Sequence, residues 1–188
     1  MGGSGTMNWL TTILLLATAF LAVFWEAAFT GLRNLVGAQI DLLPPLMVYA
    51  GLCTGLTTVC LVSFLGGLWF DSLSANPLGI SILPLFAVGL GIYVTRELIL
   101  RDQVFAQLVL GLVSSAATPL LTLILLLTTG HAPLLGWGTI WQLGVMSAGG
   151  ALATPAFFVL FDWLHRSLAH ARTTETSFRP DREIRRGR

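Results

Sequence analysis

The sequence contains very little charge and no lysine. Its 188 residues include 9 acidic and 10 basic residues, and every basic residue is Arg. Charged residues make up 10% of the chain, whereas soluble domains carry about 25%. Hydrophobic residues make up 55%, and the mean hydropathy is +0.81. This composition excludes an ordinary soluble domain and predicts an all-α, polytopic membrane protein.

Catalytic motifs and metal-binding clusters are also missing from the sequence. It has no HExxH, GxSxG or P-loop motif, and the stretch 103–161 offers no charged residue as an acid or a base. Cys53 and Cys60 are seven residues apart, so on one helix their Cα atoms would lie about 10.5 Å apart, too far for a disulfide. The histidines are expected to be exposed polar residues: His131, His165 and His170. We therefore expect no enzymatic activity, no bound metal and no cofactor.

Four intervals without charge are long enough to hold membrane-spanning helices, because crossing about 30 Å of hydrocarbon takes about 20 helical residues. They are 9–24, 42–70, 77–95 and 103–161. The second interval contains Pro44, Pro45 and several glycines, and it forms either one tilted helix or two short ones. The fourth interval is divided by breakers at 128–133 and 136–138. These intervals give five or six membrane spans, and a count of six is consistent with the charge distribution.

The ends of the chain differ in character from its apolar body. Residues 1–6 read as an expression-tag remnant ahead of a natural start at Met7. A cleaved signal peptide is disfavoured, because no basic residue precedes the first apolar run. We expect a six-helix transmembrane domain at 7–164 and an Arg-rich cytoplasmic tail at 165–188.

Arginine is distributed unevenly along the chain, which predicts the orientation. Seven of the ten arginines lie within 166–188, and two more lie in the loop 96–102. Because basic residues stay on the cytoplasmic side, the tail and this loop are expected inside, with Asp71 and His131 outside. With six spans, Arg33 also lies outside and both termini are cytoplasmic.

Asp71 lies in a glycine-rich turn between two apolar runs, where an unpaired carboxylate would cost about 2.5 kcal/mol or more. Asn76 as an N-cap and Pro77 at the first helical position predict that the next helix starts there. Asp71 either caps helix ends in this turn, by accepting backbone N–H groups, or forms an ion pair. The candidate ion-pair partner within the chain is Arg33, and a polar group of another protein is the alternative.

Small residues four positions apart allow helices to approach closely in lipid. The pairs are Gly51/Gly55, Gly67/Asp71, Ala87/Gly91, Gly111/Ser115 and Gly144/Ala148. These pairs predict a compact helical bundle. Each pair packs either the interior of this bundle or a face for another protein, and the former is favoured.

The pattern Phe64-x-x-Gly67-x-x-x-Asp71-x-x-x-x-x-x-Leu78-Gly79 in the third of six short spans resembles the rod shape-determining protein MreD family. The chain length, the six-span layout and the segment from Asp41 to Tyr49 are similar as well. The resemblance covers about 42–98 in detail and the remainder by hydropathy alone. The site residues that it carries over are Gly67, Asp71, Leu78 and Gly79.

The resemblance implies a non-enzymatic subunit of the bacterial elongation machinery in the cytoplasmic membrane. Members of the family bind MreC, a single-span protein with a large extracytoplasmic domain. They help to link MreB filaments to the RodA glycosyltransferase and its class B penicillin-binding partner, and so support rod shape and lateral peptidoglycan synthesis. The implied fold is similar to that of the substrate-binding components of energy-coupling-factor vitamin transporters.

That fold similarity raises a second possibility, a small-molecule binding subunit of a transporter. Such a site needs a cavity with several convergent polar groups. The spans offer Thr and Ser, Gln107 and three tryptophans: Trp9, Trp69 and Trp141. The Arg-rich tail is expected to lie near anionic lipid, and docking of MreB or another cytoplasmic partner is the less favoured alternative.

Overall fold

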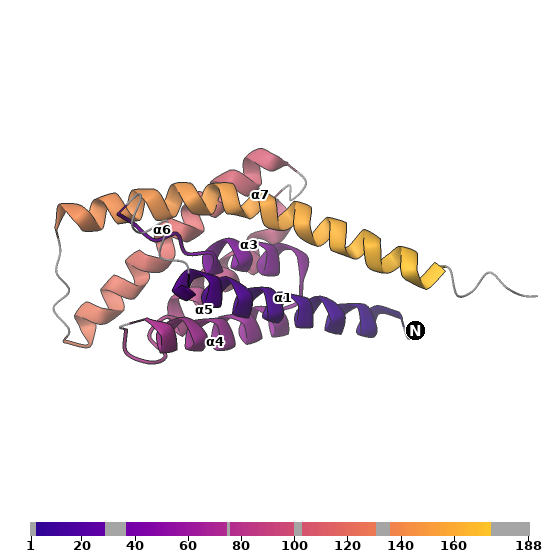
Figure 1. Cartoon of the computed structure of the whole chain (residues 1–188), viewed down its shortest axis with the longest axis horizontal. Coiled ribbons are helices and arrows are strands. Elements are labelled where there is room, and N and C mark those ends of the chain that lie inside the picture. Colours follow the sequence, from indigo (N-terminus) through magenta and orange to yellow (C-terminus); the bar gives the residue numbers. More distant parts are fainter. Residues whose placement is uncertain (1–2, 29–36, 75, 100–102, 131–135, 174–188) are drawn as a thin grey trace, which may run out of the picture. The chain divides into compact units, whose positions relative to one another are not determined.

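The computed structural model describes residues 3–28, 37–74, 76–99, 103–130 and 136–173. Within these residues every regular element is a helix and there is no strand (Figure 1). The elements are α1 (Gly3–Ala28), α3 (Leu43–Cys53), α4 (Leu56–Leu73), α5 (Ile82–Thr95), the 3₁₀ turn η1 (Arg96–Leu98), α6 (Val104–Thr128) and α7 (Trp137–Thr173). The predicted all-α class is confirmed.

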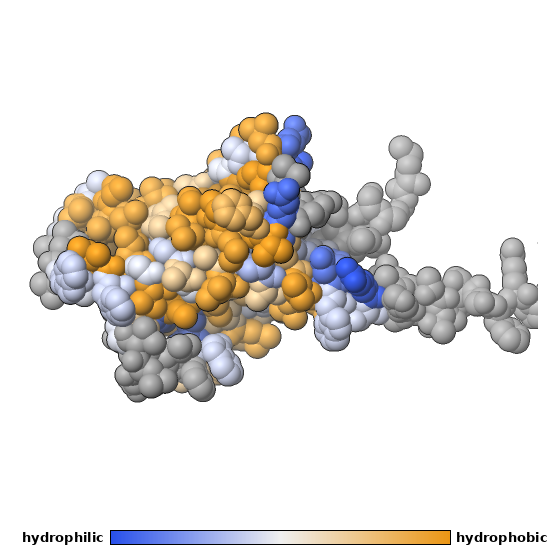
Figure 2. All heavy atoms as spheres, turned by 90° about the horizontal axis from the view of Figure 1, so that it is seen from above, coloured by the Kyte–Doolittle hydropathy of each residue, from blue (hydrophilic) through white to orange (hydrophobic). Residues whose placement is uncertain are grey.

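Four of these helices are long and apolar enough to cross a membrane. Their candidate spans are Trp9–Ala28, Leu56–Leu73, Val104–Thr128 and Trp137–Ser167. Large apolar side chains cover most of the face seen in Figure 2, as lipid-facing helices require. The chain is therefore a membrane protein by the length and composition of its helices, whereas the count of six spans stays a prediction.

α3 is the central helix of the bundle and has only 11 residues, about 16 Å of helix. Its residues from Leu43 to Leu52 are all buried, as expected for a helix that is hydrophobic all round. Pro44 and Pro45 fall in its first turn, where backbone N–H groups have no partner within the helix. Extended backbone at Thr54 and Gly55 separates α3 from α4. Of the two alternatives for 42–70, the pair of helices is thus confirmed.

Contacts between α1 and α4 show that these two helices run in the same direction. The Thr12 hydroxyl is 2.8 Å from that of Thr58 near the start of α4. The Phe20 ring packs edge-to-face against Trp69 near the end of α4, with centroids 5.3 Å apart. α3 contacts α1 and is joined to α4 by a two-residue break. It therefore returns the chain from the end of the bundle where α1 finishes to the end where α4 begins.

The start of α5 differs from the sequence prediction. The predicted N-cap was Asn76, but α5 begins at Ile82 with Ser81 as its N-cap residue. Residues from Pro77 to Ser81 form a turn instead, in which Gly79 has φ +88°. The early start is wrong because a side chain ten residues upstream, Asp71, binds Ser81 and holds this turn outside the helix.

Several small residues mark close approaches between helices. A Cβ added at Gly67 would lie 2.9 Å from Ile82 Cα, and one added at Gly51 would lie 2.9 Å from Ile92 Cγ2. The Gly111/Ser115 pair of α6 meets Gly150 and Thr154 of α7, where an added Cβ on either glycine would overlap the facing side chain. The predicted small-residue faces are therefore used within the bundle at these positions.

Other predicted packing residues lie on open faces. A Cβ added at Gly55, Gly91 or Gly144 would meet no atom of the described chain within 4 Å. Ala148 is exposed next to Gly144 on α7.

The chain divides into two compact units, Met1–Phe157 and Phe158–Arg188. α7 runs through this division and through the predicted domain boundary at 164 without a break, up to Thr173. In the second unit, the His165 ring nitrogen Nδ1 is 2.7 Å from the Phe161 carbonyl oxygen, a contact within one helical turn.

Candidate functional site

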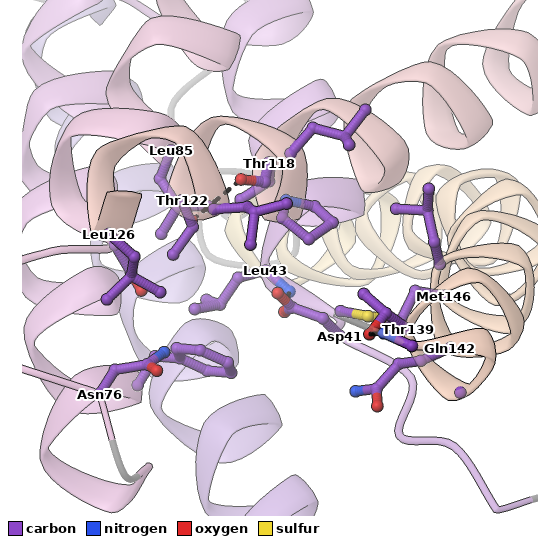
Figure 3. Close-up of a pocket in the computed structure, with 18 of the residues that line it drawn as sticks. Asp41, Leu43, Asn76, Leu85, Thr118, Thr122, Leu126, Thr139, Gln142 and Met146 are labelled. Carbon is purple, nitrogen blue, oxygen red and sulfur yellow. Dashed lines mark hydrogen bonds between the residues drawn. The ribbon is translucent and has the colours of Figure 1, made fainter. Parts of the chain in front are cut away.

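A cavity of about 600 Å³ lies in the first unit, at the end of the bundle that carries Asp71 (Figure 3). It forms where α3, α5 and α7 begin and where α4 and α6 end. We call it the Asp71-end cavity. Its described lining comprises Gly37, Asp41, Leu43, Phe70, Asn76, Ser81, Leu85, Thr118, Pro119, Leu120, Thr122, Leu123, Leu126, Gly136, Gly138, Thr139, Gln142, Leu143 and Met146.

The walls of this cavity combine apolar surface with a few polar groups. Leucines, Phe70 and Met146 supply the apolar part. The amides of Asn76 and Gln142, several hydroxyl groups and the carboxyl group of Asp41 supply the polar part, and Figure 3 shows residues of both kinds around the same space. Both its volume and its mixed lining are typical of binding pockets.

Asp71 builds one wall of the cavity through Ser81. Its side chain is only 2% exposed. Its Oδ2 accepts the Ser81 backbone N–H at 3.0 Å, and its Oδ1 accepts the Ser81 hydroxyl at 2.5 Å. The carboxyl group thus satisfies the first turn of α5, the capping type of role expected from the sequence, with a partner that the sequence did not identify.

The four residues of the family-like pattern lie in or near the α4–α5 connection, next to Ser81, and none of them belongs to the described lining of the cavity. Gly67 lets α4 approach the backbone of Ile82, one turn away from the bonds that Asp71 makes to Ser81. Gly79, at φ +88°, adopts a conformation that other residues rarely take. Leu78 is 71% exposed and makes the tip of the turn. Three of the four residues are therefore placed to shape the α4–α5 connection, and the fourth lies on its surface.

A second pair of carboxyl groups meets the start of α3. Glu26 Oε1 accepts the Leu42 backbone N–H at 2.6 Å, and Asp41 Oδ1 accepts the Leu43 N–H at 2.9 Å. These bonds satisfy donors at the N-terminus of a buried helix and favour negative charge there. Glu26 Oε2 is buried and has no hydrogen-bond partner among the described residues.

Asp41 lines the cavity and is 6% exposed. Burial raises the pKa of its carboxyl group from 3.8 to about 6, against the opposing effect of the Leu43 N–H bond. Sequence reasoning assigned no function to Glu26 or Asp41. The available signal was an acidic residue three positions before a Pro-Pro pair at a helix start.

Several sequence-predicted residues lie away from the cavity. Arg33 and His131 fall outside the described residues, so the Asp71–Arg33 ion pair stays a prediction. Gln107 is buried on α6, and neither it nor the three highlighted tryptophans belong to the described lining. Gly144 and Ala148 border a shallow groove of about 340 Å³ on α7, together with Trp137, Ile140, Trp141 and Val145.

The opposite end of the bundle has a smaller, hydroxyl-rich cavity of about 350 Å³ between α1, α3 and α4. Its lining includes Thr11, Thr12, Thr54 and Thr58. Arg96 donates to the Thr54 carbonyl oxygen at 3.3 Å and lies over the Tyr93 ring, which joins the end of α5 to the α3–α4 break.

No group of three or more His, Cys, Asp or Glu side chains in the described part of the chain is arranged to hold a metal ion. Within that part, Cys53 and Cys60 are also not joined in a disulfide.

These features define the class of protein: a helical membrane protein with a mixed polar and apolar cavity at one end of its bundle. Comparison of the chain with protein-family models, curated proteins and solved structures finds no match.

Proposed function

We propose that this protein is a non-enzymatic membrane scaffold of the MreD type, which binds MreC in the bacterial elongation machinery. One observation carries the proposal: Asp71 of the family-like pattern holds Ser81, and Ser81 lines the Asp71-end cavity. An acid of the family-like pattern that supports the lining of a pocket favours a role in recognition over a role in packing alone.

The predicted orientation makes the cavity accessible to MreC. The arginine distribution predicts that Asp71 lies outside, and this orientation supports a cavity that opens on the outer side of the membrane. MreC has one span and a large extracytoplasmic domain, and the segment that joins them emerges at this level. We propose that this segment enters the Asp71-end cavity, and that MreB, RodA and the class B penicillin-binding protein are reached through the same assembly.

The test is co-purification of MreC from the same organism with this protein in detergent. Gln142 lines the cavity, is exposed and has no side-chain hydrogen bond among the described residues. Gln142→Trp should fill the cavity and lower MreC recovery about tenfold or more. Leu152→Trp, on an exposed face of α7 outside the described lining, is the matched control and should leave recovery unchanged. Failure of the unmodified protein to bind MreC would refute the proposal.

A small-molecule binding subunit of a transporter is the second candidate, favoured by the volume and mixed lining of the same cavity. Native mass spectrometry of the purified protein distinguishes the two. A stoichiometric, vitamin-sized ligand that Gln142→Trp removes would favour transport. Bound MreC without such a ligand would favour the scaffold.

A further inference from the structure

The polar lining of the Asp71-end cavity is rich in hydrogen-bond acceptors. The Ser81 hydroxyl donates to Asp71, the Thr118 hydroxyl donates to the Ser114 carbonyl, and the Thr122 hydroxyl donates to the Thr118 carbonyl at 2.9 Å. Each of these hydroxyl protons is therefore already used, and only oxygen lone pairs remain for an occupant. These three hydroxyl groups favour a ligand that donates hydrogen bonds, whereas the amides of Asn76 and Gln142 can donate as well as accept.

Asp41 is the only ionisable side chain in the described lining. One carboxyl oxygen accepts the Leu43 N–H, and the other has no hydrogen-bond partner among the described residues. The side chain is 94% shielded from solvent, yet this second oxygen is not among the fully enclosed oxygens, so it stays within reach of an occupant of the cavity. A cation placed beside it would supply the missing interaction.

The charge balance at this end of the bundle points the same way. The described segments that meet there carry three carboxyl groups, those of Glu26, Asp41 and Asp71, and no basic side chain. Asp71 is satisfied by Ser81, whereas Glu26 keeps one buried oxygen without a partner in the described chain. The carboxyl groups with incomplete hydrogen bonding therefore lie at the start of α3, next to the cavity.

We propose that the occupant of the Asp71-end cavity presents an ammonium or guanidinium group to Asp41. This inference rests on the proposed function, so the occupant is the extracytoplasmic segment of MreC next to its span, and the cation is a Lys or Arg of that segment. The aliphatic stem of such a side chain lies along Leu43, Phe70 and Leu143, while its charged head reaches Asp41 and the lone pairs of Thr122.

The central experiment measures the affinity of purified MreC for Asp41→Asn in lipid nanodiscs. Asn keeps an oxygen that can accept the Leu43 N–H, so the fold is retained and thermal unfolding serves as the check. We expect MreC to bind about tenfold or more weakly, because a charged pair is replaced by a neutral contact. Asp162→Asn, an exposed acid on the second unit, is the matched control and should bind as the unmodified protein does.

The dependence on pH provides an independent readout. With a pKa of about 6, Asp41 is mostly ionised at pH 7 and mostly protonated at pH 5. The affinity of the unmodified protein for MreC should fall about tenfold over this range. Among the described residues, the titratable groups that also face this region are Glu26 of α1 and Asp71 of α4, whereas Arg33 and His131 lie outside the described residues. Asp41→Asn should remove most of the pH dependence if Asp41 is its source.

Each alternative outcome has a distinct meaning. If Gln142→Trp abolishes MreC binding but Asp41→Asn binds within twofold of the unmodified protein, MreC uses the cavity and the cation is refuted. If Arg33→Gln weakens binding as much as Asp41→Asn, and the double variant is no worse, the chain's own arginine is the partner of Asp41 and the inference fails.

Failure of the proposed function itself gives a different pattern, in which the unmodified protein does not bind MreC at all. Thiamine, a cation, and riboflavin, which is neutral, then serve as small-molecule probes. Binding of thiamine that Asp41→Asn removes would overturn MreC as the occupant and assign the carboxylate to a small cation. Binding of neither probe would overturn the recognition of a cation as well.

Discussion

At the scale of single residues, the site depends on how each buried carboxyl group is compensated. Asp71 accepts two hydrogen bonds from one residue, whereas Asp41 accepts one and borders a cavity. The first arrangement is complete within the chain and stabilises the fold. The second leaves binding capacity for another molecule, which is why the two acids are assigned different roles.

The Asp71–Ser81 interaction can be tested by its energetic coupling. Asp71→Ala should lower the free energy of unfolding by about 2–3 kcal/mol, because it leaves a buried N–H without a partner. Ser81→Ala removes only the hydroxyl bond and should cost about 1–2 kcal/mol. Since both changes remove the same bond, the double variant should cost less than the sum. Reversible unfolding in mixed detergent micelles measures these values.

Ser72→Ala is the control for this comparison, because the exposed Ser72 hydroxyl bonds only a carbonyl in its own helix. It should change stability by less than about 0.5 kcal/mol. Strictly additive effects of Asp71→Ala and Ser81→Ala would show that the two side chains act independently and would contradict the assigned interaction.

At the scale of helices, sequence patterns predicted breaks well and long-range partners poorly. Gly55 lies in the α3–α4 break, which was one of the two alternatives for 42–70, and Gly130 follows the end of α6, because glycine and its neighbours act locally. The start of α5 was misplaced because Ser81 meets Asp71 only through the fold. Asp41 was missed as a site residue for the same reason, since five helices bring the cavity together and no local spacing encodes it.

Two glycines on neighbouring helices provide a matched test of close packing. A Cβ at Gly67 would press on the backbone of Ile82, so Gly67→Ala should separate α4 from α5 and cost about 1–3 kcal/mol. Gly91 of α5 has open space in the described structure, so Gly91→Ala should gain up to about 1 kcal/mol of helix propensity. Equal effects of the two substitutions on the unfolding free energy would contradict the assigned contact.

At the scale of the whole molecule, the directions of the helices agree with the predicted orientation. Because α1 and α4 run in the same direction, the chain between them has to return, and α3 makes that return. α3 is shorter than the hydrocarbon is thick, yet it is enclosed by other helices and needs little contact with lipid. The start of α1 therefore lies at the end of the bundle where Arg96 binds Thr54, on the side predicted to be cytoplasmic.

This arrangement predicts which positions face each side of the membrane in cells. In a variant with Cys53 and Cys60 replaced by Ala, Leu78→Cys should react with a membrane-impermeant maleimide added outside, because Leu78 lies in the exposed turn beside the cavity. Leu98→Cys, which is also exposed but lies in the same 3₁₀ turn as Arg96, should react only after the membrane is permeabilised. A tag at the N-terminus should be protected from external protease in intact cells, as six crossings require.

Cleavage of that tag, with the two cysteine variants behaving as expected, would mean that one helix between the N-terminus and Leu78 does not cross. Labelling of Leu98→Cys from outside would instead invert the whole molecule and remove the Asp71-end cavity from the side on which MreC is expected.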